Sequence, residues 1–303
     1  MPADSLDVIV VGGGPAGLSA ALWLGRCRRR VLLIDAGHGR NAAARGLHGF
    51  LSRDGLAPEK LRELGREELV RYGVVVRDGT VTAASCRDAG FELELEGGER
   101  LAARKLVLAT GVRDRLPEID GLEARYGASV HHCPYCDGWE HRDQALAVYG
   151  RGRAGFGLAR KLTSWSSDIV LCTDGAPGLK AAERGELERL GIAVEKKRIA
   201  GLEGAGSRLE RIRFADGSAL ERQALFFTLG WELCSPLGLN LGCRLTRKGC
   251  IVTDDHQQSQ VPGLYVIGDA SRDVQLVALA VAEGAKAALH LHEQMLEEDL
   301  RRR

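Results

Sequence analysis

The sequence predicts an α/β protein built from two similar domains. Short β-branched and aliphatic runs alternate with helix-forming stretches, which is the pattern of strand–helix–strand units. Two glycine-rich turns of the form G-x-G-x-x-G begin at Gly12 and Gly150, about one domain length apart. The chain has 303 residues, which fits about two domains of ~100–200 residues each. The fold class is therefore a duplicated α/β unit.

The first glycine motif lies in a complete strand–helix–strand pattern. An apolar run over residues 7–11 predicts a strand that is buried on both faces, and residues 18–25 predict a helix. A second apolar run over residues 31–34 predicts the next strand, which ends at Asp35. The glycine-rich turn over residues 12–17 connects the first strand to the helix, as in dinucleotide-binding folds.

Each glycine of this turn has a separate physical role. Gly12 permits the tight turn, Gly14 lets a pyrophosphate approach the backbone, and Gly17 allows the helix and strand to pack closely. Free N–H groups at the start of the helix can hold phosphates. Asp35 follows about 20 positions later and can accept a hydrogen bond from a ribose hydroxyl. We interpret the unit as a nucleotide site rather than as a purely structural turn.

The same pattern returns in the middle of the chain. Residues 145–149 predict a strand, residues 150–155 form the second glycine turn, a helix runs to Trp165, and residues 168–172 predict the next strand. The order of elements is that of the first unit. The chain therefore contains a second dinucleotide-binding fold.

Three further segments complete the predicted fold. Residues 74–108 alternate apolar and polar side chains in short pieces such as 91–95, which predicts a small antiparallel sheet. Residues 264–269 predict another buried strand that ends in Gly-Asp, and residues 275–292 predict a helix. The charged tail, residues 297–303, is expected to fray.

The composition limits the partners of the chain. Lys and Arg total 42 against 41 for Asp and Glu, so the net charge of +1 gives no reason to expect nucleic acid or an anionic membrane. No apolar run approaches the ~20 residues of a membrane span. The N-terminus lacks the pattern of a secretory signal. We expect a cytoplasmic protein with neither nucleic acid nor membrane as a partner.

A C-x-x-C pair suggests redox chemistry. Cys133 and Cys136 can close a disulfide across one helical turn, and Pro134 suits the first position of a helix. Unpaired N–H groups at a helix start favour a thiolate there. The alternative is a metal site that includes His131 and His132, but no second ligand pair follows, so we expect redox chemistry and no metal. The remaining cysteines are interpreted as buried apolar residues: Cys27, Cys86, Cys172, Cys234, Cys243 and Cys250.

Together these motifs resemble a known family. An A-T-G at 109–111, a C-x-x-C-D at 133–137 and a G-D at 268–269 stand in order with the two glycine turns. Over nearly its whole length the sequence resembles the low-molecular-weight thioredoxin reductases, which are FAD-dependent pyridine-nucleotide–disulfide oxidoreductases. The resemblance implies a homodimer and two Rossmann-like, three-layer domains, the second inserted in the first. It places an FAD-binding domain at 1–115 and 244–303, and an NAD(P)H-domain-like fold carrying the C-x-x-C at 116–243.

The resemblance also assigns residues to the FAD. The glycines of the first turn meet the pyrophosphate, Asp35 meets the adenosine ribose, and Asp269 meets the ribityl chain or a flavin-side phosphate. Gln275 approaches the pyrimidine edge of the flavin, and Asn41 stands where the family has a flavin-contacting Gln. The complete implied set is Gly12, Gly14, Pro15, Ala16, Gly17, Asp35, Asn41, His48, Thr110, Gly111, Gly268, Asp269 and Gln275.

Three residues are implied to be catalytic. Cys136 is the sulfur nearer the flavin, Cys133 is the sulfur that attacks a disulfide substrate, and Asp137 is the acid/base that protonates the leaving thiolate. His131 and His132 are unusual for the family. They either assist proton transfer or cap the segment, and the second interpretation is favoured.

The chain departs from the family where NADPH would bind. The second nucleotide strand is followed by Cys172-Thr-Asp174, with no basic cluster for a 2′-phosphate. An acidic side chain repels that phosphate and can accept from a free 2′-hydroxyl instead. Arg151 and Arg153 occupy variable positions of the glycine turn, where they bind phosphate or fill the pocket. We expect that NADPH is not the donor, which leaves NADH, ferredoxin or another electron carrier.

Two directions of the reaction remain open. The partner is a thioredoxin-like protein or a small dithiol or disulfide. Natural-product dithiol oxidases carry His directly after the C-x-x-C, whereas Asp137 stands here and favours a reductase. Residues 138–140, Gly-Trp-Glu, look oxidase-like. A redox-sensing flavoprotein without turnover and a flavin monooxygenase-like enzyme are the alternatives from other classes, and the cysteine pair argues against both.

Overall fold

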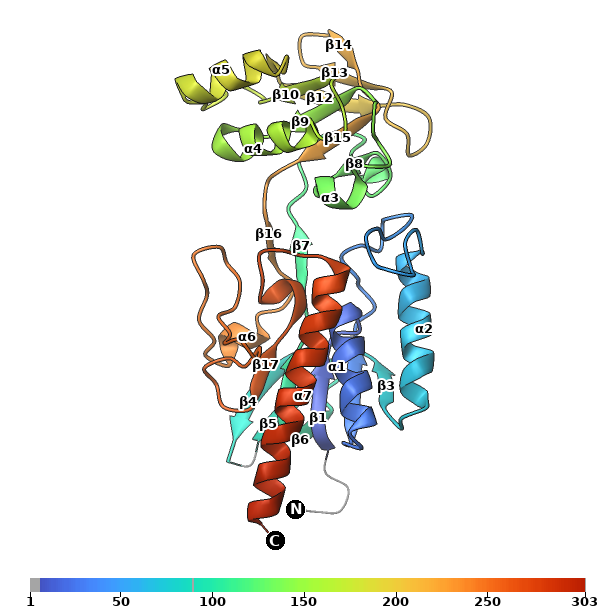
Figure 1. The fold of residues 1–303 in the computed structure, drawn as a ribbon, viewed down its shortest axis with the longest axis vertical. Coiled ribbons are helices and arrows are strands. Elements are labelled where there is room, and N and C mark those ends of the chain that lie inside the picture. Colours follow the sequence, from blue (N-terminus) through green and yellow to red (C-terminus); the bar gives the residue numbers. More distant parts are fainter. Residues whose placement is uncertain (1–5, 89, 303) are drawn as a thin grey trace. The chain divides into compact units, whose positions relative to one another are not determined.

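The computed structural model describes residues 6–88 and 90–302, which form two compact units (Figure 1). Unit 1 comprises Met1–Ala42, Gly49–Arg113 and Glu232–Arg303, and unit 2 comprises Ala43–His48 and Asp114–Trp231. Two short strands, β7 (Val112–Asp114) and β16 (Trp231–Leu233), pair where the chain passes from one unit to the other. These divisions differ from the sequence-based boundaries at residues 115 and 243.

Unit 1 is built on a seven-stranded sheet in the order β3-β2-β1-β6-β5-β4, with β17 also paired to β6. Its strands are β1 (Leu6–Val11), β2 (Val31–Asp35), β3 (Val75–Asp78), β4 (Val81–Arg87), β5 (Gly90–Leu95), β6 (Arg100–Leu108) and β17 (Leu264–Val266). Its helices are α1 (Pro15–Arg26), α2 (Pro58–Val70), α6 (Leu237–Asn240), η2 (Gly268–Ala270) and α7 (Val277–Arg301).

The expected antiparallel strands are present, but they do not form a separate sheet. Strand β6 pairs in parallel with β1 through residues 103–108 and antiparallel with β5 through residues 100–103. Strand β3, which was expected in the same antiparallel sheet, instead pairs in parallel with β2 at the opposite edge. The long β6 therefore joins both parts into one sheet.

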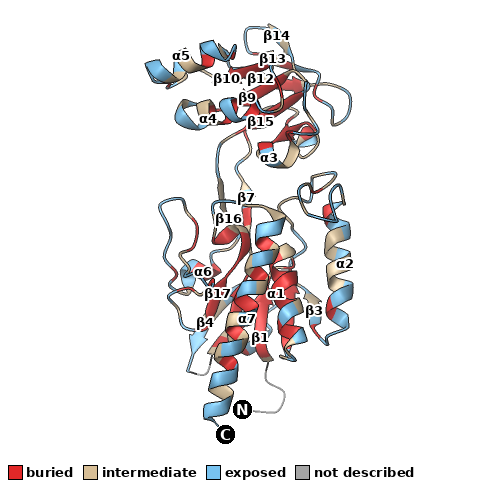
Figure 2. Cartoon of the chain, viewed as in Figure 1, coloured by how far each residue is buried: buried red, intermediate tan, exposed pale blue. Residues whose placement is uncertain are grey.

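Apolar cores fill both faces of this sheet (Figure 2). On one face α1 and α7 cover strand residues such as Val8 and Val10. On the other face Ile9 and Val11 pack in a cluster with Leu237 and Cys243. This packing explains why residues 232–243 belong to unit 1, although the sequence analysis placed them in the inserted domain.

The charged tail is helical as far as Arg301, which corrects the sequence-based expectation of a frayed end. Helix α7 continues to Arg301, well beyond the expected end at residue 292. Arg104 pairs with Asp299 at 2.7 Å, and Arg29 pairs with the same carboxylate at 2.7 Å. Lys105 pairs with Glu298 at 2.5 Å. These ion pairs attach the last turns of α7 to the rest of unit 1.

Unit 2 repeats the layered plan around a five-stranded sheet in the order β11-β10-β9-β15-β8. One core lies toward α4 and α5, and the other lies toward an antiparallel sheet of β12, β13 and β14. The elements are η1 (Glu123–Arg125), β8 (Val130–His131), α3 (Pro134–Asp137), β9 (Leu146–Tyr149), α4 (Gly152–Leu162), β10 (Ile169–Cys172), α5 (Ala181–Arg189), β11 (Ala193–Glu195), β12 (Ile199–Glu203), β13 (Arg211–Phe214), β14 (Ala219–Glu221) and β15 (Ala224–Phe227).

All pairings within the five-stranded sheet are parallel. The carboxyl ends of β8 and β9 therefore lie at the same edge. Strand β8 leads directly into the cysteine pair, and β9 leads into the second glycine turn. In the part of the chain that the structure describes, no helix has the length and apolar character needed to cross a membrane.

Candidate active site

The first glycine turn of unit 1 is held in close contact with the segment after β6. Gly12 has a φ of 109°, and a Cβ there would lie 2.3 Å from the carbonyl oxygen of Ala109. A Cβ on Gly17 would lie 1.9 Å from the carbonyl oxygen of Gly12. Both positions therefore require glycine, and the turn lies directly against Ala109 and Thr110.

Gly14 differs from these two glycines because the space around it is open. Its φ is −75°, which any residue can adopt, and a Cβ there would have no protein atom within 4 Å. Gly14 is the N-cap of α1, Pro15 stands in the first turn, and that turn contains no acidic residue. An open helix start with unpaired N–H groups and no negative charge fits the pyrophosphate of a dinucleotide.

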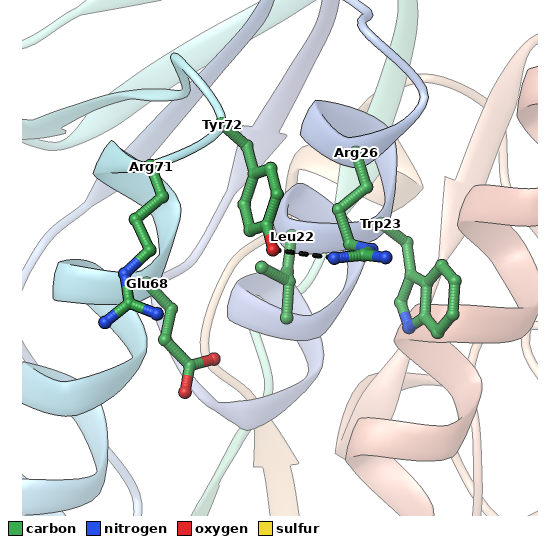
Figure 3. Close-up of a pocket in the computed structure, with 6 residues that line it drawn as sticks. All are labelled: Leu22, Trp23, Arg26, Glu68, Arg71 and Tyr72. Atoms are coloured by element: carbon green, nitrogen blue, oxygen red, sulfur yellow. Dashed lines mark hydrogen bonds between the residues drawn. The ribbon is translucent and has the colours of Figure 1, made fainter.

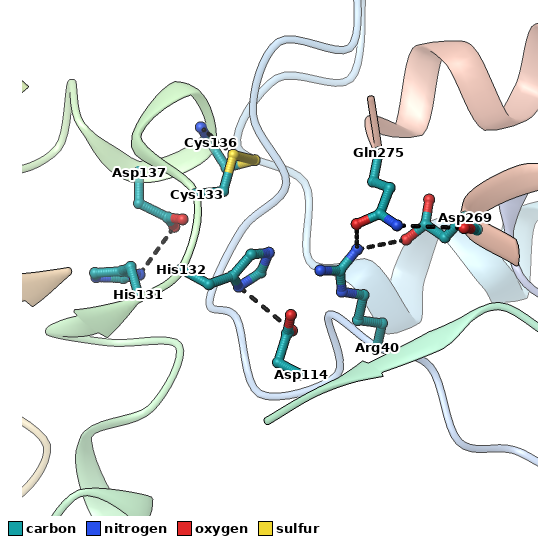
Figure 4. Close-up of a disulfide and its surroundings, with 9 residues drawn as sticks. All are labelled: Arg40, Asp114, His131, His132, Cys133, Cys136, Asp137, Asp269 and Gln275. Atoms are coloured by element: carbon teal, nitrogen blue, oxygen red, sulfur yellow. Dashed lines mark hydrogen bonds and ion pairs between the residues drawn. A yellow bond between two sulfur atoms is a disulfide. The ribbon is translucent and has the colours of Figure 1, made fainter. Parts of the chain in front are cut away.

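The same end of the sheet includes η2. A Cβ on Gly268, where φ is 71°, would lie 3.0 Å from the Cβ of Ala16, so η2 packs against the start of α1. Beside it, Arg40 Nη1 donates to Asp269 Oδ2 at 2.8 Å and to Gln275 Oε1 at 2.6 Å (Figure 4). The structure thus brings Ala16, Gly268, Asp269 and Gln275 together. Sequence reasoning missed Arg40, which no motif distinguishes.

Asp35 lies at the end of β2 and is already paired with two cations. Its Oδ2 accepts from Arg62 at 2.8 Å and from Arg66 at 2.7 Å, both on α2. Burial acts to raise the pKa of Asp35, but hydrogen bonds from Arg66, Gly37, Arg62 and Gly13 lower it below its ordinary value. Sequence reasoning missed the two arginines, although their i, i+4 spacing puts them on one face of a helix.

Asn41 and His48 lie in different units. Asn41 follows Arg40 in unit 1, whereas His48 belongs to unit 2. There its Nδ1 lies 3.6 Å from Glu140 Oε1. Their roles toward a flavin stay predictions, as do those of Thr110 and Gly111.

The cysteine pair lies at the end of β8 in unit 2. Cys133 is the N-cap of α3, and its Sγ accepts from the backbone N–H of Cys136 at 3.2 Å. The two residues form a disulfide with a Cα–Cα distance of 5.4 Å (Figure 4). No group of three or more metal-ligating side chains occurs among the described residues. The local geometry suits a disulfide that opens and closes at a helix start.

Asp137 is the next residue of α3 and contacts a histidine. His131 Nδ1 lies 3.2 Å from Asp137 Oδ1, and His131 Nε2 lies 2.9 Å from Nε2 of His141. His132 faces a different partner, because its Nδ1 lies 3.4 Å from Asp114 Oδ2. The side chains of the two adjacent histidines therefore contact different carboxylates, and neither acts only as a cap of the segment.

The second glycine turn is covered by its own chain. The N–H of Gly152 donates to the carbonyl oxygen of Pro177 at 2.8 Å. Arg151 folds over the same region: its Nε donates to the carbonyl oxygen of Thr173 at 2.6 Å, and its Nη2 pairs with the Asp174 carboxylate at 3.6 Å. Asp174 Oδ1 also accepts from the N–H of Ile199 at 2.9 Å. These groups are therefore bonded to one another within unit 2.

A surface pocket of 340 Å³ contains none of the predicted site residues (Figure 3). Arg26 donates to the Tyr72 hydroxyl at 2.6 Å, and its guanidinium lies 5.8 Å from the centre of the Trp23 ring. Trp23 and Arg26 belong to the C-terminal half of α1, whereas the glycine turn lies at its start. The pocket is therefore not part of the nucleotide site.

A family model described as pyridine nucleotide-disulphide oxidoreductase matches residues 6–284. The chain belongs to this family. It is similar to the probable thioredoxin reductase of Arthroderma benhamiae, with 32% identity over an alignment of 333 positions that covers 98% of this chain and 82% of that protein. A thioredoxin reductase of Claviceps purpurea is 32% identical over 306 residues, covering 96% and 94%. The solved structure of HlmI shares 37% identity and a TM-score of 0.94, covering 99% and 95%.

The family identity and the geometry agree. The protein is an FAD-dependent disulfide oxidoreductase of the thioredoxin reductase type, with the α/β fold of two Rossmann-like units that the sequence predicted. The open space at Gly14 and the positive end of α1 fit the dinucleotide part of FAD. The family pairs FAD with a pyridine nucleotide.

Proposed function

We propose that this oxidoreductase moves two electrons between FAD and a dithiol or disulfide through Cys133 and Cys136. The observation that carries the proposal is the disulfide at the start of α3, followed directly by Asp137. A thioredoxin-like protein or a small dithiol or disulfide is the substrate. The homodimer that the family resemblance implies stays a prediction.

The residues of this chain suffice for the thiol half of the reaction. Bound FAD supplies or accepts the electron pair. With the cysteines reduced, the Cys133 thiolate attacks a substrate disulfide, and one substrate sulfur leaves as a thiolate that takes a proton from Asp137. Asp137 then takes the proton of the Cys136 thiol, and the Cys136 thiolate attacks the Cys133 sulfur. The second substrate sulfur leaves as a thiolate that takes this proton from Asp137, and the Cys133–Cys136 disulfide is restored. Two electrons and two protons have passed to the substrate.

The electron donor is not NADPH in this proposal. A 2′-phosphate needs cations in its binding shell, and the described segment after β10 presents Thr173 and Asp174 in that place. Arg151 is hydrogen-bonded to the backbone of this same segment. The N–H of Gly152, which would otherwise face a pyrophosphate, is bonded to Pro177. The engaged Asp174 carboxylate likewise argues against a ribose contact with NADH, which favours ferredoxin or another carrier.

The test is an anaerobic titration of the FAD-loaded protein with four reductants: NADPH, NADH, dithiothreitol and reduced ferredoxin. We expect dithiothreitol to bleach the flavin and stoichiometric NADPH to leave it yellow. Rapid bleaching by micromolar NADPH would contradict the proposal and identify the protein as an ordinary NADPH-dependent thioredoxin reductase. Air is then admitted to the dithiothreitol sample to distinguish a disulfide reductase from a dithiol oxidase. Continuous oxygen uptake would identify a dithiol oxidase.

A further inference from the structure

Behind Asp137 lies a line of hydrogen-bonded side chains that the proposed mechanism does not use. His131 Nδ1 is 3.2 Å from Asp137 Oδ1 (Figure 4). His131 Nε2 is 2.9 Å from His141 Nε2, and His141 Nδ1 is 2.8 Å from Gln144 Oε1. All four residues belong to unit 2, so the line is internal to one compact body.

The line is shielded from solvent at its centre. His131 is 5% exposed, and its ring lies 5.4 Å from the ring of Phe226 on β15. Burial lowers the pKa of His141, with the Gln144 bond acting in the opposite direction. Among the described residues, Asp137 and Glu140 are the acidic groups that act on the His141 ring, and Glu140 also pairs with His48. Burial therefore favours the neutral form of the His141 ring.

One arrangement of protons fits all three contacts. With a neutral His141 whose Nδ1–H donates to the Gln144 amide oxygen, Nε2 of that ring is an acceptor. Nε2 of His131 must then donate to it. Only Nδ1 of His131 is left to exchange a proton with Asp137 Oδ1. With one proton between the two groups, Asp137 is either a carboxylic acid beside a neutral His131 ring or a carboxylate beside an imidazolium. The two forms hold the same number of protons.

We propose that His131, oriented by His141, is a positioning residue that shares the proton of Asp137 and extends the pH range over which this acid protonates a leaving thiolate. The inference rests on the proposed acid role of Asp137. An isolated aspartate carboxyl releases its proton near pH 4 and would be an empty donor at neutral pH. The His131 imidazole, 3.2 Å from the carboxylate, is a second group that can hold this proton.

The step can be followed with dithiothreitol as the probe. One of its thiolates attacks a sulfur of the Cys133–Cys136 disulfide, and the S–S bond breaks as the departing cysteine thiolate takes the shared proton. The second dithiothreitol sulfur then attacks the mixed disulfide, so that the reagent is oxidised by two electrons and the cysteine pair is reduced. Two electrons are gained by the protein for each dithiothreitol oxidised.

The experiment compares anaerobic FAD-loaded variants with the parent between pH 5 and pH 8.5. Electrons taken up are counted as alkylated thiols by mass spectrometry and as loss of flavin absorbance. Every variant reacts with the same reagent at the same pH. The ratio of variant rate to parent rate is therefore independent of the ionisation of dithiothreitol. For His131→Leu and His131→Gln we expect this ratio to fall with rising pH, by up to about tenfold per pH unit until water becomes the donor.

Three further variants make the result decisive. His141→Gln keeps an acceptor for His131 and should preserve the parent profile, whereas His141→Leu should not. His132→Gln is the matched control, because it alters the neighbouring histidine that faces Asp114 instead. A ratio that is constant across pH for both His131 variants would overturn the inference, since a purely structural role lowers the rate uniformly. If Asp137→Asn itself keeps the parent profile, the proposed acid fails instead.

Discussion

The N–H of Gly152 donates to the carbonyl oxygen of Pro177 at 2.8 Å, whereas a Cβ at Gly14, the matching position of the first glycine turn, would have no protein atom within 4 Å. The backbones differ as well, because φ is 55° at Gly152 and −75° at Gly14. The two turns share a sequence motif but not a conformation. A Cβ at Gly152 would lie 3.6 Å from the carbonyl oxygen of Gly178, so the second turn differs from the first mainly in its φ and in the bond of its N–H to Pro177.

Asp174 is expected to stabilise unit 2 rather than to bind a nucleotide. Its φ is 48°, and its Oδ1 accepts from the N–H of Ile199. Asp174→Ala should lower the free energy of unfolding by about 1–2 kcal/mol, from the lost bond and the strained backbone. Asp174→Asn keeps an acceptor and tolerates this φ, so it should lose much less in a urea titration. The opposite result would be reduction of the parent flavin by NADH, together with loss of that reduction in Asp174→Ala at unchanged stability. That result would identify Asp174 as a ribose ligand.

Gly14 is expected to be required for FAD and not for folding. Gly14→Val introduces no backbone strain at φ −75°, and its Cβ has no protein atom within 4 Å, so thermal unfolding of the apoprotein should be nearly unchanged. The side chain would occupy the space of the pyrophosphate, and the purified variant should bind little or no FAD. Gly185→Ala, on α5 with no atom within 4 Å, serves as the control and should bind FAD like the parent. A yellow, stoichiometrically loaded Gly14→Val protein would contradict the assignment.

Asp35 should give unit 1 a pH-dependent stability. Its pKa in the folded protein is below the ordinary value of 3.8, so its contribution is fully present above that pH and is lost as the pH falls through the folded pKa. We expect Asp35→Asn to lose about 1–3 kcal/mol at pH 7, and progressively less below pH ~4.

Asp78→Asn is the matched control for Asp35, because it removes an exposed partner of the same Arg66. It should cost about 0–1 kcal/mol with little pH dependence. Urea unfolding of the three proteins between pH 3 and pH 7 makes the comparison. Equal losses of stability in both variants at every pH would show that the ion pairs of Asp35 contribute no more than the exposed pair of Asp78.

The local motifs predicted most of the fold, because each glycine turn, strand and helix depends on neighbouring residues. The same motifs could not show the join through β6, since a strand that pairs in parallel on one side and antiparallel on the other follows from tertiary contacts. They also could not show the fate of the tail. Glu298 and Asp299 look like solvated charges until folding places Arg104 and Lys105 beside them.

The candidate site shows the same limit. Glycines and cysteines are marked by spacing, whereas Arg40 is distant in sequence from Asp269 and Gln275, which it joins in space. The sequence leaves two interpretations of His131, proton transfer or capping, because its contact with His141 depends on the turn that follows α3.

The end of α7 should be ordered in solution because of its ion pairs. Burial acts to raise the pKa of Glu298, but Lys105 and Arg104 lower it below its ordinary value. The double variant Glu298→Gln, Asp299→Asn should lose about 1 kcal/mol and exchange the amides of the last turns faster. Glu297→Gln, whose partner Arg301 is exposed, is the control and should behave like the parent. Rapid exchange of these amides in the parent would show that the tail frays after all.

The most direct test of the central claim is the anaerobic reduction of the flavin by dithiothreitol in the parent, in Cys136→Ser and in Cys86→Ser. Cys86, on β4 in unit 1, serves as the control; it is exposed, as is Cys234, which corrects the expectation that all the remaining cysteines are buried. If electrons pass through the Cys133–Cys136 disulfide, the parent and Cys86→Ser bleach at the same rate and Cys136→Ser bleaches far more slowly. Bleaching of Cys136→Ser at the parent rate would show that the cysteine pair is not the route to the flavin.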